Sequence, residues 1–186
     1  MTNYNQYYDY LKSRSRMGLL YRNLVLYPRL SRELKGLTLD IGCGIGDFLK
    51  FRKKTIGVDI NPQTVAYCKS KNLNAHLMEI DQIPFKDNFF DCAILDNVLE
   101  HIVDPSILIK EIFRVTKADC TLIIGVPEIK GFSADIDHKV FYDEKILAQV
   151  MTQNGWQNEN FFHMPFKSNF MAKKFTQFCL YGVFRK

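Results

Sequence analysis

The architecture of this chain is indicated by one continuous segment, Leu37-Thr-Leu-Asp-Ile-Gly-Cys-Gly-Ile-Gly-Asp47. A short apolar run, typical of a buried strand, leads into three glycines and then into the start of a helix. The glycines permit positive φ and let a ligand approach the backbone closely. Their G-x-G-x-G spacing differs from the dinucleotide fingerprint, and the missing Gly-Lys-Ser/Thr excludes a P-loop. Asp40 and Asp47 flank the glycines, which disfavours a pyrophosphate and suits a positively charged ligand.

Strand-like and helix-like segments alternate on either side of this loop. Continuous apolar runs predict five strands and helical patterns separate them, which indicates a mainly parallel, doubly wound α/β sheet. Two further strands near the C-terminus have no helix between them, so we expect that pair to be antiparallel. The seven predicted strands are 37–41, 55–60, 74–79, 89–96, 120–126, 156–164 and 177–185.

Acidic side chains follow the second and third predicted strands. Asp59 ends the second strand, nineteen residues after Asp40, where a carboxylate can accept both hydroxyls of a ribose. Asp81 follows the third strand, where it can accept a hydrogen bond from an adenine amino group. Each aspartate could instead be a plain strand-end cap, but together with the glycine loop they favour a ligand. Further motifs follow in order: Asp81-Gln-Ile-Pro-Phe85, Phe90-Asp-Cys-Ala-Ile94 and Leu99-Glu-His101.

In these motifs the chain resembles the class I S-adenosylmethionine-dependent methyltransferases. The likeness is close over residues 37–126 and looser toward the C-terminus. It implies a Rossmann-like fold with S-adenosyl-L-methionine as cofactor. The resemblance also implies roles: Asp40, Gly42 and Gly44 line the methionine part, Asp59 holds the ribose, Ile60 packs on the adenine, Asp81 and the backbone of Gln82 meet the adenine edge, and Asn97 lies beside the methyl group.

Histidines are the candidate general bases. His101 follows the fourth strand, near the expected methyl site, and His138 lies in the long segment 127–142, which should overhang the pocket. Each has a structural alternative, as a packed or hydrogen-bonded loop residue. Asp135 and Asp137 beside His138 match no metal-binding spacing, so we expect no metal site. His76 and His163 are expected to be structural.

Composition indicates one ordinary globular domain over residues 1–186. The chain is 47% apolar and 24% charged, and no apolar run approaches the roughly 18–20 residues needed to cross a bilayer. The five cysteines are odd in number and scattered, with no Cys-x-x-Cys pair. This usage agrees with a reducing compartment, so we expect a cytoplasmic protein.

The net charge of +5 is unevenly spread. Residues 1–35 hold seven Lys or Arg and two Asp or Glu, and residues 164–186 hold five and none, so two basic flanks enclose an acidic middle. We expect residues 1–35 to form a helical cap over the core, 36–186. An amphipathic contact with a membrane surface is the alternative use of this segment. No RNA-binding motif is present, which argues against a nucleic-acid partner.

The resemblance implies methyl transfer, which we expect to occur to an oxygen, and the basic flanks suggest a small anionic acceptor. A phosphorylated sugar or a surface-glycan precursor is an example that rests on analogy with the family. The basic side chains expected around it are Arg14, Arg16, Lys167, Lys173 and Lys174. A cofactor-binding regulator or partner subunit without its own catalysis is the alternative from another class. The glycine spacing and Asp40 disfavour a nicotinamide-dependent reductase.

Overall fold

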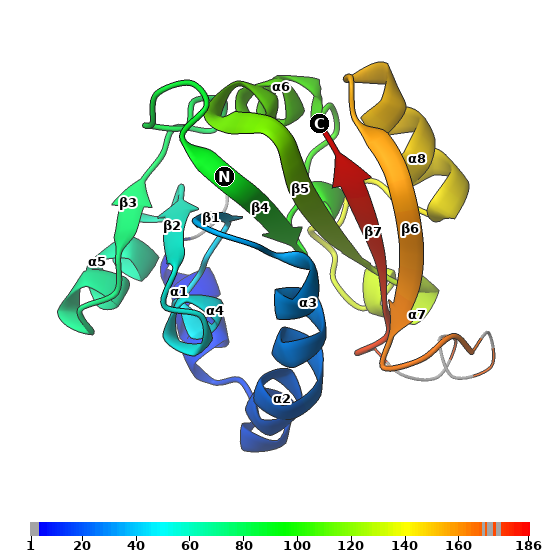
Figure 1. The fold of residues 1–186 in the computed structure, drawn as a ribbon. Helices are drawn as coiled ribbons and strands as arrows, with labels where there is room; N and C mark the ends of the chain where they lie inside the picture. The colour runs from blue at the N-terminus through cyan, green and yellow to red at the C-terminus, as the bar shows by residue number, and fades with distance from the viewer. Residues whose placement is uncertain (1–3, 169, 171–172, 174–175) are drawn as a thin grey trace.

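A seven-stranded sheet in the order β3-β2-β1-β4-β5-β7-β6 organises the chain (Figure 1). The computed structural model describes residues 4–168, 170, 173 and 176–186. The strands are β1 (Thr38–Ile41), β2 (Thr55–Asp59), β3 (Ala75–Leu77), β4 (Phe90–Asp96), β5 (Thr116–Pro127), β6 (Gln157–Met164) and β7 (Cys179–Arg185).

Parallel pairing joins β1 to β2 and β4, β2 to β3, and β4 to β5. Strand β7 runs antiparallel to both of its neighbours, β5 and β6. The predicted doubly wound sheet, with an antiparallel pair at the C-terminus, is therefore confirmed. The order of strands reverses between β1 and β4, and ligands of open α/β sheets bind beyond the carboxyl ends at such a point.

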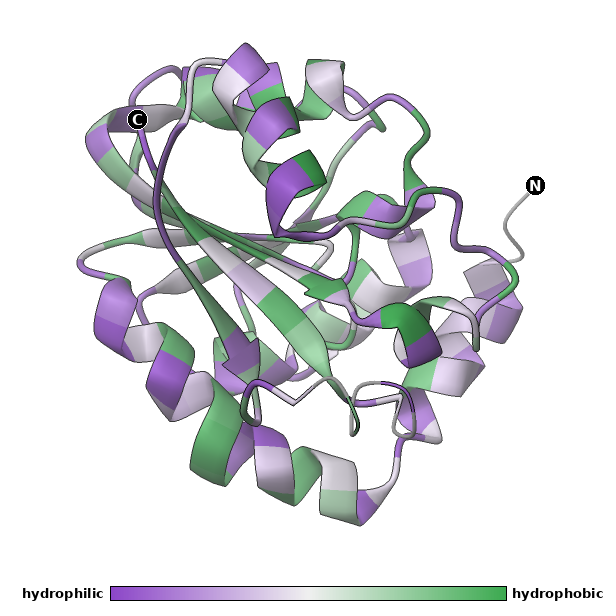
Figure 2. Ribbon diagram, turned by 90° about the vertical axis from the view of Figure 1, so that its right-hand side faces the viewer, coloured by the Kyte–Doolittle hydropathy of each residue, from purple (hydrophilic) through white to green (hydrophobic). Residues whose placement is uncertain are grey.

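Helices cover both faces of the sheet, as Figure 1 shows. The helices are α1 (Tyr4–Lys12), α2 (Arg16–Tyr21), the π-helix η1 (Arg22–Leu26), α3 (Tyr27–Glu33), α4 (Asp47–Phe51), α5 (Pro62–Ser70), the 3₁₀ helix η2 (Leu99–His101), α6 (Ser106–Val115), α7 (Ile129–Phe132) and α8 (Glu144–Gln153). Alternate residues of a strand face opposite sides. Thus Leu95 of β4 packs into the core under α6 and α8, whereas Ile94 packs into the core under α3. The apolar strands stand out in green between these layers in Figure 2.

Several element boundaries differ from the predicted ones. Strand β5 starts at Thr116 rather than Cys120, because helix α6 ends at Val115 and the chain continues directly into the sheet. Strand β3 is three residues long, shorter than the predicted strand 74–79, and helix α4 ends at Phe51. Aspartate is a preferred residue at a helix N-cap, and Asp143 caps α8 by accepting a hydrogen bond from the backbone N–H of Ile146 at 2.7 Å.

The N-terminal segment is helical and docks on the core through α1. The Asn61 side chain donates a hydrogen bond to the carbonyl of Tyr4 at 3.0 Å, and the Tyr8 and Tyr67 rings meet edge to face. Leu11 is buried at 1% exposure. By contrast, Met17 and Leu24, in α2 and η1, are among the most exposed apolar side chains.

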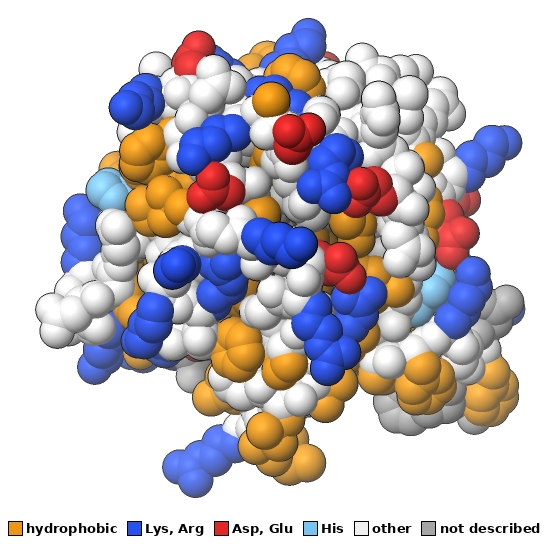
Figure 3. Space-filling view, viewed as in Figure 1, with side chains coloured by type: hydrophobic (Ala, Val, Ile, Leu, Met, Phe, Trp, Pro, Cys, Tyr) orange, Lys and Arg blue, Asp and Glu red, His pale blue; other side chains and the backbone are white. Residues whose placement is uncertain are grey.

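Apolar and basic side chains lie next to one another at the edge of the molecule formed by α2 (Figure 3). A contact of this surface with a membrane, the alternative use of the N-terminal segment, stays a prediction. Among the helices that the structure describes, none has the length and apolar character required to cross a membrane.

Candidate functional site

A cavity of about 600 Å³ includes residues from the carboxyl ends of β1 and β4, where the strand order reverses. This volume is within the range of small-molecule sites. Asp40 and the glycine loop line the cavity from β1, and Asp96 and Asn97 line it from β4. Tyr7, Tyr10, Leu11 and Arg14 line it from α1 and the residues after it, so the N-terminal segment forms part of its wall.

The conformation of the glycine loop requires residues without side chains at two positions. Gly42 has a φ of +72°, and a Cβ there would lie 2.4 Å from Cγ2 of Val98. Gly44 has a φ of +53°, and its backbone N–H donates a hydrogen bond to Asp59 at 2.8 Å. The loop therefore leaves a cradle beside Asp40 that any other residue would narrow.

Asp40 is a buried carboxylate, 6% exposed, that lines this cavity. Burial raises the pKa of Asp40 well above its ordinary value, and Asp96 and Asp59 raise it further. A bound cation would offset both effects. The ammonium and sulfonium groups of S-adenosylmethionine fit this requirement, so the residues around the cradle fit the cofactor.

Asp59 and Ile60 lie beside the glycine loop but outside the residues that line the cavity. One Asp59 oxygen accepts the Gly44 N–H, and the other accepts the Asn61 N–H at 2.8 Å. Each carboxylate oxygen has two lone pairs, so Asp59 can accept further hydrogen bonds. Ile60 is 39% exposed and has room for a partner. Their ribose and adenine contacts stay predictions.

Asp81 and Gln82 lie elsewhere. They line a second hollow, of about 630 Å³, together with Ile83 and with Arg114 of α6. Neither residue is among those lining the cavity of Asp40. The structure thus brings Asp40, Gly42, Gly44 and Asn97 into one cavity and leaves the predicted adenine-edge residues apart from them.

Asn97 directly follows β4 with a φ of +55°. Its side-chain amide donates a hydrogen bond to Oδ1 of Asp96 at 3.0 Å, and the hydroxyl of Tyr181 donates to the same oxygen at 2.9 Å. Burial raises the pKa of Asp96, and the hydrogen bond from Tyr181 lowers it. A second carboxylate thus lies near Asp40, which strengthens the attraction of the cavity for a cation.

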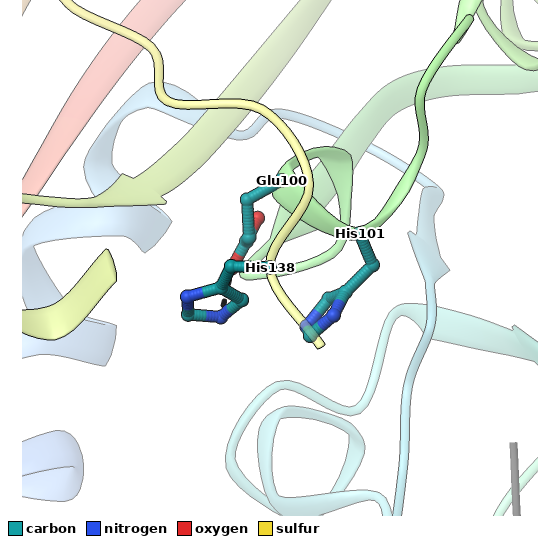
Figure 4. Close-up of side chains that lie close together, drawn as sticks. All are labelled: Glu100, His101 and His138. Atoms are coloured by element: carbon teal, nitrogen blue, oxygen red, sulfur yellow. Dashed lines mark ion pairs between the residues drawn. The ribbon is translucent and has the colours of Figure 1, made fainter. Parts of the chain in front are cut away.

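Both predicted histidines line the same cavity, and they converge on Glu100 (Figure 4). The His101 and His138 ring centroids lie 4.7 Å apart, and Nε2 of His138 lies 3.8 Å from Oε1 of Glu100. Burial raises the pKa of Glu100 to about 8. Burial also lowers the pKa of His101, with His138 adding to the shift.

The basic flanks reach the cavity only in part. Arg14 and Arg22 line it, and neither forms an ion pair with a described residue. Arg16 does not line it, and Lys167 instead pairs with Glu144 at 2.9 Å. Lys173 is not a lining residue either, and Lys174 lies outside the residues that the structure describes.

The polar residues of the cavity that the sequence-based prediction missed include Glu100, Asp96, Tyr181 and Arg22. Glu100 stood in the Leu99-Glu-His101 motif, but only its neighbour was considered as a base. Asp96 could have been predicted as a site residue from the sequence, because it is the last residue of an apolar strand, just as Asp40 is the second-last residue of β1. Tyr181 carried no local signal, since its position depends on how β7 pairs.

Comparison with known proteins gives the same assignment. Residues 39–124 match the family model described as a methyltransferase domain. The chain is 32% identical over 111 residues to an uncharacterised protein of Methanocaldococcus jannaschii, covering 60% of this chain and 52% of that protein. It is 26% identical to a probable S-adenosylmethionine-dependent methyltransferase of Mycolicibacterium smegmatis, covering 71% of this chain and 55% of the relative.

The chain thus spans about half the length of the curated relatives it matches. A solved SAM-dependent methyltransferase of Thermotoga maritima superimposes with a TM-score of 0.76, covering 98% of this chain and 100% of that one at 19% identity. At that identity the likeness shows the fold alone. The family match over residues 39–124, the fold and the acidic cradle agree: the chain resembles the class I S-adenosylmethionine-dependent methyltransferases.

Proposed function

We propose that this chain transfers a methyl group from S-adenosylmethionine to a hydroxyl oxygen of a small anionic acceptor. One observation carries the proposal: a single cavity is lined by an acidic cradle for a cationic cofactor, a histidine pair and two arginines that form no ion pair with a described residue. A phosphorylated sugar or a surface-glycan precursor is an acceptor of this chemistry. We place the reaction in the cytoplasm, because all five cysteines are free.

When bound, S-adenosylmethionine supplies a methyl group activated by a sulfonium, whose C–S bond breaks with its electron pair left on sulfur as the new O–C bond forms. The chain has to orient the acceptor and take its proton. Nδ1 of His138 donates to the carbonyl of Phe132 at 2.9 Å. That hydrogen bond leaves Nε2 of neutral His138 with its lone pair, free to accept the hydroxyl proton.

The two arginines account for the anionic part of the acceptor. Arg14 follows α1 and Arg22 starts η1, so both come from the N-terminal segment. A guanidinium binds a phosphate or carboxylate through paired hydrogen bonds. Because described acidic residues leave both arginines unpaired, an acceptor anion could use them without first breaking an ion pair.

Turnover with radiolabelled S-adenosylmethionine tests the proposal. Phosphorylated sugars and their unphosphorylated counterparts would be assayed with the wild type, Arg14→Ala, Arg22→Ala and the control Arg32→Ala. Arg32 is an exposed arginine of α3 that does not line the cavity. We expect turnover with the phosphorylated acceptors and a KM about tenfold or more higher in the two cavity variants, since a charged hydrogen bond contributes about 1.5–3 kcal/mol.

Equal turnover of neutral and anionic acceptors would refute the anionic assignment. Binding of S-adenosylmethionine without turnover of any hydroxyl acceptor would favour the alternative, a cofactor-binding regulator or partner subunit.

A further inference from the structure

We propose that Glu100, His101 and His138 form a binding site for one divalent transition-metal ion in the wall of the cavity. One ligand atom from each residue, two imidazole nitrogens and a carboxylate oxygen, lies within 4.8 Å of the others. Tetrahedral zinc with bonds of about 2.1 Å holds its ligand atoms roughly 3.4 Å apart. Small side-chain rotations therefore suffice to close the three groups around an ion.

Backbone hydrogen bonds hold the two contributing segments together. The carbonyl oxygen of Glu100 accepts from the N–H groups of Lys139 and Val140, at 2.7 and 3.1 Å. Residues 99–101 and the segment with His138 are thus joined directly at the cluster, as Figure 4 shows. The backbone hydrogen bonds thus fix the position of His138 relative to Glu100 and His101.

Each imidazole has a backbone carbonyl oxygen near its Nδ1 atom. Nδ1 of His138 donates to the Phe132 carbonyl at 2.9 Å, and Nδ1 of His101 lies 3.3 Å from the Asp137 carbonyl. Metal-binding histidines characteristically donate one ring N–H to such an outer partner, which fixes the tautomer and leaves the other nitrogen for the ion. No described residue hydrogen-bonds Nε2 of either histidine.

The burial of the Glu100 carboxylate supports the metal site independently of the distances within the cluster. Its side chain is 1% exposed, and neither carboxylate oxygen has a hydrogen-bond partner among the described residues. A buried carboxylate without a partner is costly, and native structures satisfy such groups with hydrogen bonds, opposite charges or metals. Because one Glu100 oxygen lies within 4.8 Å of a ring nitrogen of each histidine, one ion would satisfy all three groups.

The donor set favours zinc, cobalt or iron(II) over magnesium, since imidazole nitrogen suits the former and Mg²⁺ prefers oxygen. Three protein ligands leave at least one position open. A carboxylate oxygen of Asp135 lies 3.9 Å from Nε2 of His138, so Asp135 is a candidate for a further ligand of the ion. In the role that rests on the proposed function, the open position holds the acceptor hydroxyl and lowers its pKa, and the proton passes to water. With the ion bound, Nε2 of His138 is a metal ligand and the ion takes over its part as the base.

This inference departs from the metal-free expectation drawn from sequence. That expectation considered Asp135, Asp137 and His138 alone. Asp137 contributes its backbone carbonyl to His101, whereas Glu100 and His101 come from a segment more than thirty residues earlier.

Metal binding can be read without any methyl donor or acceptor. Full-length protein would be treated with a chelator, desalted and titrated with Co²⁺ by visible absorption, and with Zn²⁺ and Mg²⁺ by calorimetry. We expect one equivalent of Co²⁺ or Zn²⁺ and much weaker Mg²⁺ binding. His101→Ala, His138→Ala and Glu100→Gln should each weaken binding by more than the roughly 10–100-fold that loss of an outer partner costs.

His163→Gln is the matched control, because His163 also lies between two carboxylates, Glu128 at 2.8 Å and Glu144 at 3.1 Å, outside the cavity. Its affinity should equal that of the wild type. Wild-type binding no tighter than that of Glu100→Gln, or an equal loss in the control, would overturn the site. Thermal shifts with S-adenosylmethionine, measured in parallel, check that each variant folds and binds the cofactor.

The two proposals can fail separately. Metal bound at this site without turnover of hydroxyl acceptors would refute the proposed function alone. Turnover that persists in protein without bound metal, with no metal taken up on titration, would refute this site alone.

Discussion

The hydroxyl of Tyr181 donates a hydrogen bond to Oδ1 of Asp96 across an intervening strand, at a distance of 2.9 Å. Asp96 of β4 is paired with Gly125 of β5, and Gly125 is paired with Tyr181 of β7. A Cβ at Gly125 would lie 2.4 Å from both Oδ1 of Asp96 and Cε1 of Tyr181. The absence of a side chain on the middle strand thus lets the outer two meet at the edge of the cavity.

Tyr181→Phe tests the energetic value of this hydrogen bond. A hydrogen bond to a charged group contributes about 1.5–3 kcal/mol, so we expect the free energy of unfolding to fall by about that amount at neutral pH. Urea denaturation measures it. Tyr142→Phe is the control, because Tyr142 is similarly buried but its hydroxyl has no hydrogen bond to a described residue. Equal effects of the two substitutions would contradict the specific role of Asp96.

Gly125→Ala should be more disruptive than its single methyl group implies. The new Cβ would overlap the Asp96 carboxylate and the Tyr181 ring, and overpacking of this kind costs about 1–3 kcal/mol. Gly18→Ala gives the contrast, since Gly18 is in a helix and its Cβ would lie 3.3 Å from Oγ of Ser15. There the Ser15 hydroxyl has to move by only a few tenths of an ångström, so we expect a much smaller change in stability than in Gly125→Ala. Chemical denaturation of both variants measures the difference.

Sequence patterns predicted the parts of the fold that depend on local apolar runs. The glycine loop, β4 and the cap of α8 at Asp143 follow directly from apolar continuity, glycine spacing and N-cap chemistry. The insertion of β7 between β5 and β6 does not, because strand order is a tertiary property. The Tyr181–Asp96 contact depends on that insertion and so could not be predicted.

The candidate site shows the same division. Asp40, Gly42 and Gly44 are adjacent to one another in sequence, and they share one cavity. The Glu100 cluster instead depends on the folding of the segment with His138 back over η2. Burial of a glutamate away from water cannot be inferred from a motif that would be equally compatible with solvent exposure.

Asp40→Asn should separate stability from cofactor binding. The raised pKa of Asp40 means that folded protein keeps a proton at pH values where unfolded chains have lost it. Wild-type stability should therefore fall as pH rises from about 4 toward that raised pKa, by about 1.4 kcal/mol per pH unit. The variant removes this slope and should be more stable than the wild type at neutral pH. Thermal unfolding across pH measures the difference.

The same substitution should weaken S-adenosylmethionine binding by roughly 10–100-fold. This factor corresponds to the free energy that a hydrogen bond to a charged group contributes. A cation favours the ionised carboxylate, so wild-type affinity should rise with pH and the affinity of the variant should not. Calorimetry at several pH values measures both. Asp119→Asn, at an exposed residue with a φ of +63° that asparagine tolerates, is the control. Unchanged affinity for S-adenosylmethionine in Asp40→Asn would refute the role of Asp40 in an acidic cradle for the cofactor.

Leu11→Ala tests whether α1 closes the cavity. Leu11 is 1% exposed, and its Cδ1 lies 3.1 Å from the position that a Cβ on Gly44 would take, so it packs directly on the glycine loop. Removing a buried leucine side chain typically costs about 2–5 kcal/mol. In Leu11→Ala we expect this free energy to be lost mainly from the packing of α1 on the core and less from global stability, because α1 contacts the core mainly through α5.

We therefore expect faster limited proteolysis after Lys12 and Arg14 in Leu11→Ala, weaker S-adenosylmethionine binding, and a smaller change in global unfolding than in core variants. Saturating S-adenosylmethionine should restore protection, because ligand binding stabilises the closed form by mass action. Leu20→Ala removes an exposed leucine, 52% accessible, and should behave as the wild type. If Leu11→Ala lowered global stability by the full core amount while α1 stayed protected, the helix would be an integral part of the core rather than a cover for the cavity.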